Sequence, residues 1–182
     1  PIEKSACIDI VKPNTIKTEK ELADNREKAI FPYVKKANDF QIIPEVQFRK
    51  CYPYTYDFLL LYKDELAQRD KGKGHYPAWY AYGRTQGMNN YGKKLLIPYI
   101  SGTPTAVISL KEDLLFYCGY ALFCEDAETL KILKVFLESD IFWYYIRHTS
   151  KPYAKGFMAL AKNYIARFSI PNLTDSEKNN LY

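Results

Sequence analysis

The sequence predicts an α+β fold, in which a small, mostly antiparallel sheet is flanked by helices. Two observations lead to this prediction. Segments with helical signals lie on both sides of a central stretch, and that stretch holds short runs of aliphatic, aromatic and β-branched residues separated by turn residues. With 182 residues, 47% hydrophobic and 26% charged, the chain can also bury a sizeable core, which excludes a wholly disordered segment.

The first half contains two expected helices and one expected edge strand. Thr18 and Glu21 have the spacing of a capping box, which predicts a short polar helix over 18–29. The β-like segment 41–49 contains a proline, so an edge strand is predicted there. A longer helix is predicted over 53–69, because a proline stands in its first turn and a Lys-Gly-Lys-Gly run follows it.

The second half begins with β-type segments and continues with capped helices. Strands are expected over 95–100, 105–110, 117–123 and 165–170. Asp126, Ser139 and Thr174 are residues typical of helix N-caps. They predict helices over 126–138 and 140–147 and a third helix that starts near residue 175.

Cysteine, histidine and hydropathy patterns argue against several classes of protein. The four cysteines lack the close pairing of zinc ribbons, and only two histidines are present, so neither a metal site nor any catalytic residue is expected. Mostly buried, reduced thiols and the lack of a long apolar run favour a cytoplasmic protein without a membrane segment. The first residues resemble neither an initiator methionine nor a signal peptide, so we expect a piece of a larger protein.

Positive charge is concentrated in two segments of the chain. Residues 71–111 contain six Lys or Arg and no acid, and residues 141–174 contain five and no acid, whereas 112–140 contain seven acids and two lysines. If the two basic segments converge on one face, they form a surface that suits a polyanion. The alternative is a set of solvated loops whose charge separation has no function.

The densest polar and aromatic stretch lies inside the first basic segment, over 79–90. Arg, Asn and Gln can each form two hydrogen bonds with a base edge, whereas Lys reaches phosphates. The candidates for base reading are Arg84, Gln86, Asn89 and Asn90. The candidates for phosphate contact are Lys71, Lys73, Lys93, Lys94, Arg147, Lys151 and Lys155. Arg84 has an equally good alternative role, which is to buttress its own loop.

The chain from about residue 40 contains six motifs in a fixed order: Tyr52-Pro53 through Leu66-x-x-Arg69, Trp79-Tyr80-x-x-Gly83-Arg84-Thr85-Gln86, Lys94 to Ser101, Gly119-Tyr120, the helix pair Leu130 to Tyr145, and Ile170-Pro171-x-Leu173. This ordered set resembles the TaqI-like C-terminal specificity domain of type II restriction-modification methyltransferases. One departure is Glu138-Ser139-Asp140, where Asn-Ser-Lys is commoner in that family. The likeness covers the chain from about residue 40 to its end.

The resemblance implies a module that reads a short double-stranded DNA sequence. An N-terminal methyltransferase domain of the same polypeptide would then flip out an adenine and methylate its N6 from S-adenosylmethionine, and the parent enzyme could also carry an endonuclease. This chain itself lacks the Pro-Pro turn, the glycine-rich cofactor loop and the nuclease acids, so we expect neither catalysis nor a cofactor here. The expected organisation is a linker or accessory segment over 1–39, a target recognition domain over 40–174, and the start of a truncated helix over 175–182.

Two other classes of function stay open at this stage. A subunit adapter would dock on another protein through the aromatic helix at 141–146 and would present an exposed apolar patch. A stand-alone enzyme would present a deep pocket with perturbed titratable residues. Neither explains the separation of charge as simply as DNA recognition does.

Overall fold

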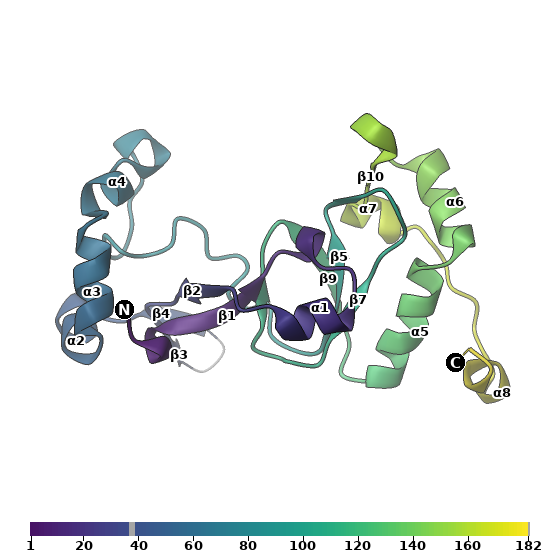
Figure 1. The fold of residues 1–182 in the computed structure, drawn as a ribbon, viewed down its shortest axis with the longest axis horizontal. Helices are drawn as coiled ribbons and strands as arrows, with labels where there is room; N and C mark the ends of the chain where they lie inside the picture. Colours follow the sequence, from purple (N-terminus) through teal and green to yellow (C-terminus); the bar gives the residue numbers. More distant parts are fainter. Residues whose placement is uncertain (37–38, 182) are drawn as a thin grey trace. The chain divides into compact units, whose positions relative to one another are not determined.

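The computed structural model describes residues 1–36 and 39–181, and it has an α+β fold with several small, mostly antiparallel sheets (Figure 1). The chain forms two compact units. The first unit consists of Pro1–Ile10 and Glu27–Tyr91, and the second of Val11–Arg26 and Gly92–Tyr182. Residues 1–10 and 27–36 belong to the first unit and residues 11–26 to the second. The expected division into a linker over 1–39 and a recognition domain over 40–174 stays a prediction.

The first unit combines short strands with a helical part. Its elements are the 3-10 helix η1 (Lys4–Ala6), β1 (Cys7–Val11), β2 (Lys28–Ile30), β3 (Tyr33–Lys36), β4 (Asp39–Ile42), α2 (Glu45–Cys51), α3 (Pro53–Leu60), α4 (Lys63–Ala67) and the 3-10 helix η3 (Arg69–Gly72). β1 pairs antiparallel with β2, and β3 with β4. The core of this unit is largely aromatic, with Phe48 fully buried and its ring stacked on Tyr80 at 4.9 Å between centroids.

The second unit is built around the antiparallel sheet β7-β5-β9. Its strands are β5 (Lys94–Pro98), β6 (Ile100–Ser101), β7 (Val107–Ser109), β8 (Leu115–Phe116), β9 (Gly119–Phe123) and β10 (Met158–Ala159). Its helices are η2 (Pro13–Thr15), α1 (Glu19–Asp24), α5 (Ala127–Leu137), α6 (Asp140–Thr149), η4 (Ala154–Gly156), α7 (Lys162–Ile165) and α8 (Asp175–Asn179).

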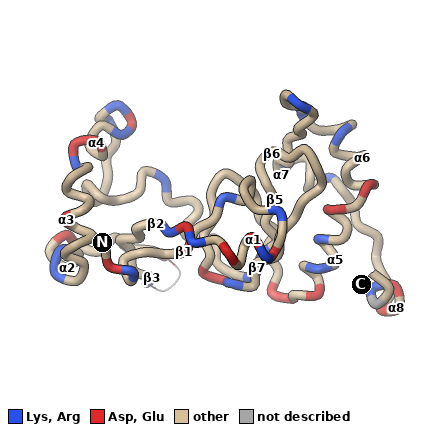
Figure 2. The backbone as a smooth tube through the Cα atoms, viewed as in Figure 1, with Lys and Arg blue, Asp and Glu red and all other residues tan. Residues whose placement is uncertain are grey.

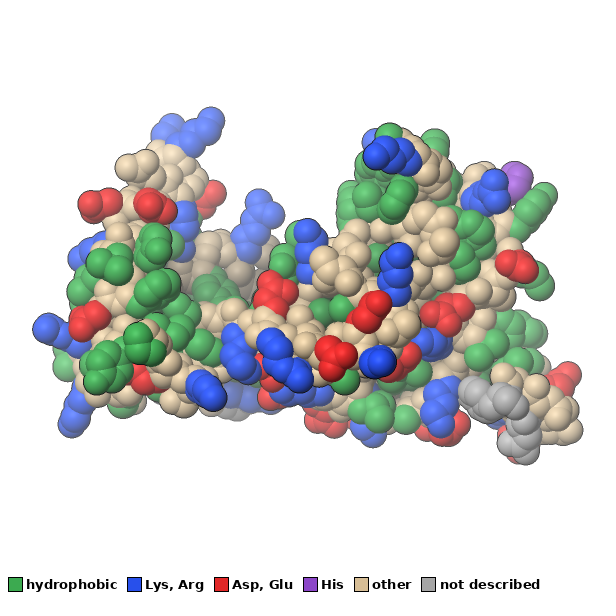
Figure 3. All heavy atoms as spheres, in the orientation of Figure 1, with side chains coloured by type: hydrophobic (Ala, Val, Ile, Leu, Met, Phe, Trp, Pro, Cys, Tyr) green, Lys and Arg blue, Asp and Glu red, His purple; other side chains and the backbone are tan. Residues whose placement is uncertain are grey.

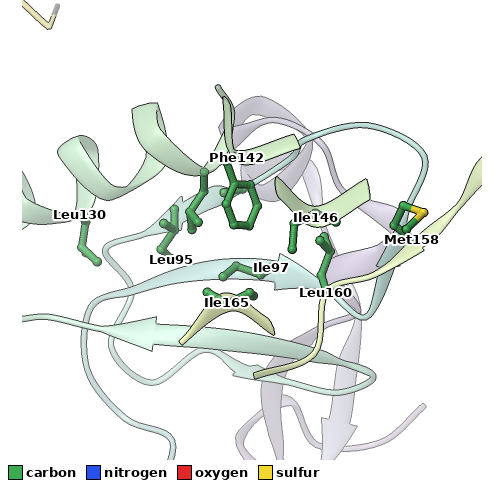
Figure 4. Close-up of a cluster of buried hydrophobic side chains, with 10 residues drawn as sticks. Leu95, Ile97, Leu130, Phe142, Ile146, Met158, Leu160 and Ile165 are labelled. Atoms are coloured by element: carbon green, nitrogen blue, oxygen red, sulfur yellow. The ribbon is translucent and has the colours of Figure 1, made fainter. Parts of the chain in front are cut away.

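The central strand β5 is buried on both faces. Leu95 and Ile97 point into a cluster with Phe142 and Ile146 of α6 (Figure 4). Leu96 lies on the opposite face, in a cluster to which residues 11–26 contribute Val11 and Ile16. A strand covered on both sides needs consecutive apolar residues, which explains the uninterrupted run in this part of the sequence.

The helix caps follow the sequence prediction. The side chains of Thr18, Asp126 and Ser139 accept hydrogen bonds from backbone amides in the first turns of α1, α5 and α6. Thr174 forms a complete capping box at α8. The aromatic helix α6 packs one side into the core through Phe142 and Ile146, while Ile141 and Tyr144 are exposed.

Five predictions about local structure are wrong. The helix predicted over 18–29 ends at Asp24, and residues 28–30 form strand β2. Segment 41–49 is mostly helix α2, because Pro44 stands at its N-cap and does not interrupt a strand. The helix predicted over 53–69 is divided into α3 and α4, and the strand predicted over 165–170 is absent from the described chain, where α7 ends at Ile165. The cysteines are free but not mostly buried, since Cys51 and Cys118 are exposed.

Candidate nucleic-acid interface

The aromatic half of segment 79–90 anchors a loop to the core of the first unit. The indole Nε1 of Trp79 donates to a carboxylate oxygen of Glu45 at 2.8 Å, and the Tyr80 hydroxyl donates to the carbonyl of Ile43 at 2.6 Å. The Tyr82 hydroxyl donates to the carbonyl of Ile30. Buried aromatic side chains with satisfied polar tips are rigid structural elements. These three hydrogen bonds therefore anchor the loop to the first unit.

Burial also keeps these phenols protonated. It raises the pKa of Tyr80 to about 12, and it raises the pKa of Tyr82 as well. Both hydroxyls thus remain donors throughout the neutral and mildly alkaline range.

Arg69 holds the same loop from the end of the helical part. Its guanidinium donates to the carbonyls of Trp79 and Ala81, at 2.8 Å for Trp79, while its Nε donates to the carbonyl of Leu66 at 2.7 Å. The guanidinium also lies 4.3 Å from the centre of the Tyr76 ring. The planar fork of arginine suits two adjacent carbonyls, so Arg69 performs the buttressing role that was an alternative for Arg84.

The polar half of the segment is exposed. Arg84, Gln86 and Asn89 are all exposed, and within residues 1–36 and 39–181 their side chains have no hydrogen bond or ion pair. Asn90 is half-buried. Met88 is buried between them, and its amide donates to the carbonyl of Thr85 at 3.0 Å, which makes this part a turn with an apolar anchor.

Two predicted phosphate contacts, Lys71 and Lys73, lie in the same unit as this loop. Both are exposed and follow α4, in a turn where Asp70 and Lys71 have φ angles of 51° and 60°. This left-handed conformation is unfavourable for residues other than glycine, so the turn holds Asp70 and Lys71 under local backbone strain.

The structure contradicts the assignment of Lys94 as a phosphate contact. Lys94 is fully buried, and its ammonium donates to the carbonyls of Glu112 at 2.9 Å and Leu114 at 2.8 Å. The Lys94 side chain therefore hydrogen-bonds backbone carbonyls inside the second unit and does not reach the surface. Lys93 is half-buried, and its ammonium donates to the carbonyl of Glu125 at 3.1 Å.

The remaining candidates, Arg147, Lys151 and Lys155, are exposed at the end of α6 and in the segment that leads to β10. Figure 2 marks the basic positions along the backbone at α6. These three candidates belong to the second unit, whereas Lys71, Lys73 and all four candidate base readers belong to the first. The convergence of both groups on one DNA surface stays a prediction.

Within the second unit, parts of the two acid-free segments do meet. β6 pairs antiparallel with β10, in the register Ile100 with Ala159 and Ser101 with Met158. The chain around this pair contains no carboxylate between residues 93 and 111 or between 141 and 174. The two acid-free segments of the sequence are therefore adjacent in the fold, where β6 and β10 pair.

Other kinds of site have little support in the described part of the chain. No group of three or more His, Cys, Asp or Glu is arranged to hold a metal ion there. No described helix has the length and apolar character needed to cross a membrane. The chain matches no protein-family model and no curated protein.

Proposed function

We propose that this chain is the double-stranded DNA recognition module of a type II restriction-modification methyltransferase. Its role would be to position a short target sequence for N6-adenine methylation by an N-terminal domain that uses S-adenosylmethionine. The observation that carries the proposal is the two-sided loop over 79–90, in which three aromatic anchors are fixed and Arg84, Gln86 and Asn89 extend into solvent without partners in the described chain.

Base reading needs polar side chains that are exposed and not already hydrogen-bonded within the protein. A guanidinium can donate to both O6 and N7 of guanine, and an amide side chain can donate to N7 and accept from N6 of adenine. A side chain already paired within the protein would have to give up those bonds first. Among the residues that the structure describes, Arg84 and Gln86 have no such bonds to give up, and the anchored backbone lowers the entropy cost of holding them at a base edge.

Exposed cations supply the part of the binding energy that does not depend on sequence. The candidates that remain are Lys71 and Lys73 in the first unit, and Arg147, Lys151 and Lys155 in the second. Binding weakens with salt, and each lysine that neutralises one phosphate contributes about −0.9 to the slope of log K against log salt concentration. Lys94 is not among them, because it is buried.

The test is duplex binding by this chain at low salt, measured by fluorescence anisotropy. A duplex recovered from a random-sequence pool is compared with a scrambled version for the wild type, Arg84→Ala and Arg84→Lys. The lysine variant keeps the charge and loses the fork. We therefore expect both variants to lose about 5- to 150-fold in preference for the selected duplex, and Arg84→Lys to keep its affinity for the scrambled one.

Arg49→Ala is the matched control, because Arg49 is exposed in the first unit but lies on α2, outside the basic segments. It should leave the preference unchanged. Equal losses of Arg84→Ala for both duplexes, or failure of the pool to yield any preferred sequence, would overturn the proposal.

One observation favours a second candidate function, docking to another protein. Tyr54, Phe58 and Leu61 recur at helical spacing along α3 and just beyond it, and Leu61 is 77% exposed. Figure 3 shows hydrophobic side chains gathered over α2 and α3. Binding through such a stripe would be insensitive to salt, so Leu61→Asp would abolish it while leaving duplex binding intact.

A further inference from the structure

The second unit exposes several aromatic side chains beside its β6–β10 strand pair. Tyr99, Tyr153 and Phe157 are 44%, 37% and 38% exposed, and they flank short strands whose own residues are largely buried. Figure 3 shows cationic and hydrophobic side chains next to one another at the end of this unit that carries β10. None of these rings takes part in the loop described above.

Tyr99 is held rigidly from both sides of its backbone. Its amide donates to the side-chain oxygen of Asn14 at 2.8 Å, and its carbonyl accepts from the amide of Leu160 at 3.0 Å. Its ring stacks on Tyr120, with 6.0 Å between centroids and 25° between planes. The exposed part of the Tyr99 ring is therefore the part that does not pack against Tyr120.

Tyr153 is fixed next to Tyr99. The neighbouring Tyr153 phenol raises the pKa of Tyr99, and the amide of Tyr153 donates to the carbonyl of Phe157 at 2.7 Å, which closes the turn through η4. The ammonium of Lys151 lies 5.6 Å from the centre of the Tyr153 ring. Lys155, at the tip of the same turn, is exposed and has a φ of 60°.

Charge complementarity points to an anionic partner with a flat apolar surface. Segments 93–111 and 141–174, which supply Tyr99, Tyr153 and Phe157, contain no carboxylate, and Lys151 and Lys155 lie on either side of Tyr153 in the sequence. A nucleotide combines a phosphate with an aromatic base, and stacking on protein aromatic rings tolerates every base because each has a π face. In a continuous duplex those faces are covered by neighbouring base pairs, so only a nucleotide outside the stack can use the rings.

We propose that Tyr99 and Tyr153 form a stacking site for an unstacked nucleotide of the bound DNA, with Lys151 and Lys155 on its phosphates. This inference rests on the proposed function and adds to it. The first unit would read paired bases, and the second would hold a nucleotide that has left the helix, as happens when a target base or its neighbour is displaced.

The experiment compares three duplexes of one sequence by fluorescence anisotropy with the whole chain. The first is fully paired, the second carries one unpaired adenine, and the third has an abasic residue in place of that adenine. We expect the wild type to bind the second duplex about 5- to 150-fold more tightly than the third. Tyr153→Leu and Tyr99→Leu should remove this preference, and Tyr153→Trp should keep it.

Tyr54→Leu is the matched control, since Tyr54 is a 67% exposed tyrosine in the first unit. It should leave the preference for the unpaired adenine unchanged. Circular dichroism of each variant identifies any that fails to fold. If a leucine variant does not fold, Tyr153→Trp is the remaining test, and loss of the preference in that folded variant would count against stacking on this ring.

The outcomes separate the two proposals. If the wild type binds the paired duplex but does not distinguish adenine from the abasic residue, the stacking site is overturned and the reading function stands. A preference that persists in both leucine variants overturns the stacking site as well. If no duplex is bound at all, the DNA recognition function fails, and the stacking site fails with it.

Discussion

Lys94 shows how one residue can be misassigned from a charge pattern. It stands beside Lys93 in an acid-free segment, yet it starts β5 and its ammonium is bonded to two backbone carbonyls inside the second unit. Burial lowers its pKa from 10.5 to about 8, although the nearby acidic side chains of Asp113 and Glu112 oppose that shift. Sequence alone could not separate it from an exposed lysine, because neighbouring residues of a strand point to opposite faces.

The lowered pKa of Lys94 predicts a stability that rises with pH. Below pH 8 the ammonium is charged in both states, whereas between about 8 and 10 the unfolded chain binds more protons than the folded one. The free energy of unfolding of the second unit should therefore increase over this window. Denaturant unfolding at several pH values should show that the free energy of unfolding of the wild type rises with pH over this window. The rise should be smaller in Lys94→Met. A slope unchanged in the variant would contradict this account.

Glu3 predicts a pH dependence of the same sign in the acid range. Burial opposes ionisation of Glu3, but hydrogen bonds from the hydroxyl and amide of Thr55 and from the amide of Tyr54 outweigh it and hold the pKa at about 2. The stabilisation is complete above the ordinary pKa of 4.5 and is lost as pH falls toward 2.

The variant Glu3→Gln should abolish that acid-dependent loss. The protection factors of amides in α3, which are exchange rates corrected for the intrinsic rate at each pH, should decrease between pH 5 and 3 in the wild type and should change less in the variant. Glu65→Gln, at an exposed carboxylate of α4, is the control. Identical profiles for Glu3→Gln and wild type would be evidence against this anchor.

At the scale of elements, segment 11–26 is a structural layer of the second unit. Glu19 accepts from the amide of Ile108 at 3.0 Å and from the ammonium of Lys134 at 2.6 Å. Asn14 bonds the backbone at Tyr99 and Ile100. These contacts join residues more than eighty positions apart, which is why a reading of local patterns could only describe the segment as a linker.

The close fit of η2 against β9 predicts that Gly119→Ala destabilises the second unit. A Cβ at Gly119 would lie 2.6 Å from Cγ of Pro13 and 2.9 Å from the carbonyl oxygen of Ile97. Overpacking of this kind costs about 1 to 3 kcal/mol. Thermal unfolding should show the loss, whereas Gly102→Ala, whose Cβ would meet only Phe157 at 3.6 Å, should change stability little. Equal stabilities of both variants would refute the close fit.

The fork of Arg69 predicts that the loop over 79–90 loosens when the fork is removed. Lysine cannot donate to two carbonyls in the same planar geometry, so Arg69→Lys should release the carbonyls of Trp79 and Ala81. Limited digestion with chymotrypsin should then cut after Trp79 or Tyr82 several times faster than in the wild type. Arg49→Lys is the control, and equal rates for Arg69→Lys and wild type would assign the restraint to the tyrosine anchors alone.

At the scale of the whole molecule, each unit has its own core. Phe48→Ala should therefore destabilise the first unit by about 3 to 5 kcal/mol, because Phe48 is fully buried among aromatic rings. Hydrogen exchange should show faster exchange of amides in α2 and α3. Amides of β5, whose residues pack in separate clusters, should keep their protection, and a uniform increase across the chain would instead indicate one cooperative unit.

The sequence predicted the fold where local patterns decide it. The class, the caps of α1, α5, α6 and α8, and the three strands of the β7-β5-β9 sheet follow from capping residues and β-type runs. The strands before residue 43 escaped prediction because they are short and depend on partners elsewhere in the chain. At Pro44 the misreading has a local cause, since proline fits both an edge strand and a helix N-terminus.

The candidate site was predictable to a similar degree. Residue types identified the polar stretch over 79–90, and Arg84, Gln86 and Asn89 are exposed as base reading requires. The roles of Arg69 and Glu45 as supports were missed, although the Leu-x-x-Arg motif already drew attention to Arg69. Their partners are backbone carbonyls and an indole, which leave no charge pattern in the sequence.

Protection of guanine N7 from methylation by dimethyl sulfate tests the central claim most directly, with the duplex selected by this chain. If Arg84 bonds to O6 and N7 of one guanine, the wild type should protect that base. Arg84→Ala should restore its reactivity while leaving the other protected positions unchanged, at protein concentrations that saturate both complexes. The same protection pattern with and without the Arg84 guanidinium would contradict the assignment of this loop to base reading.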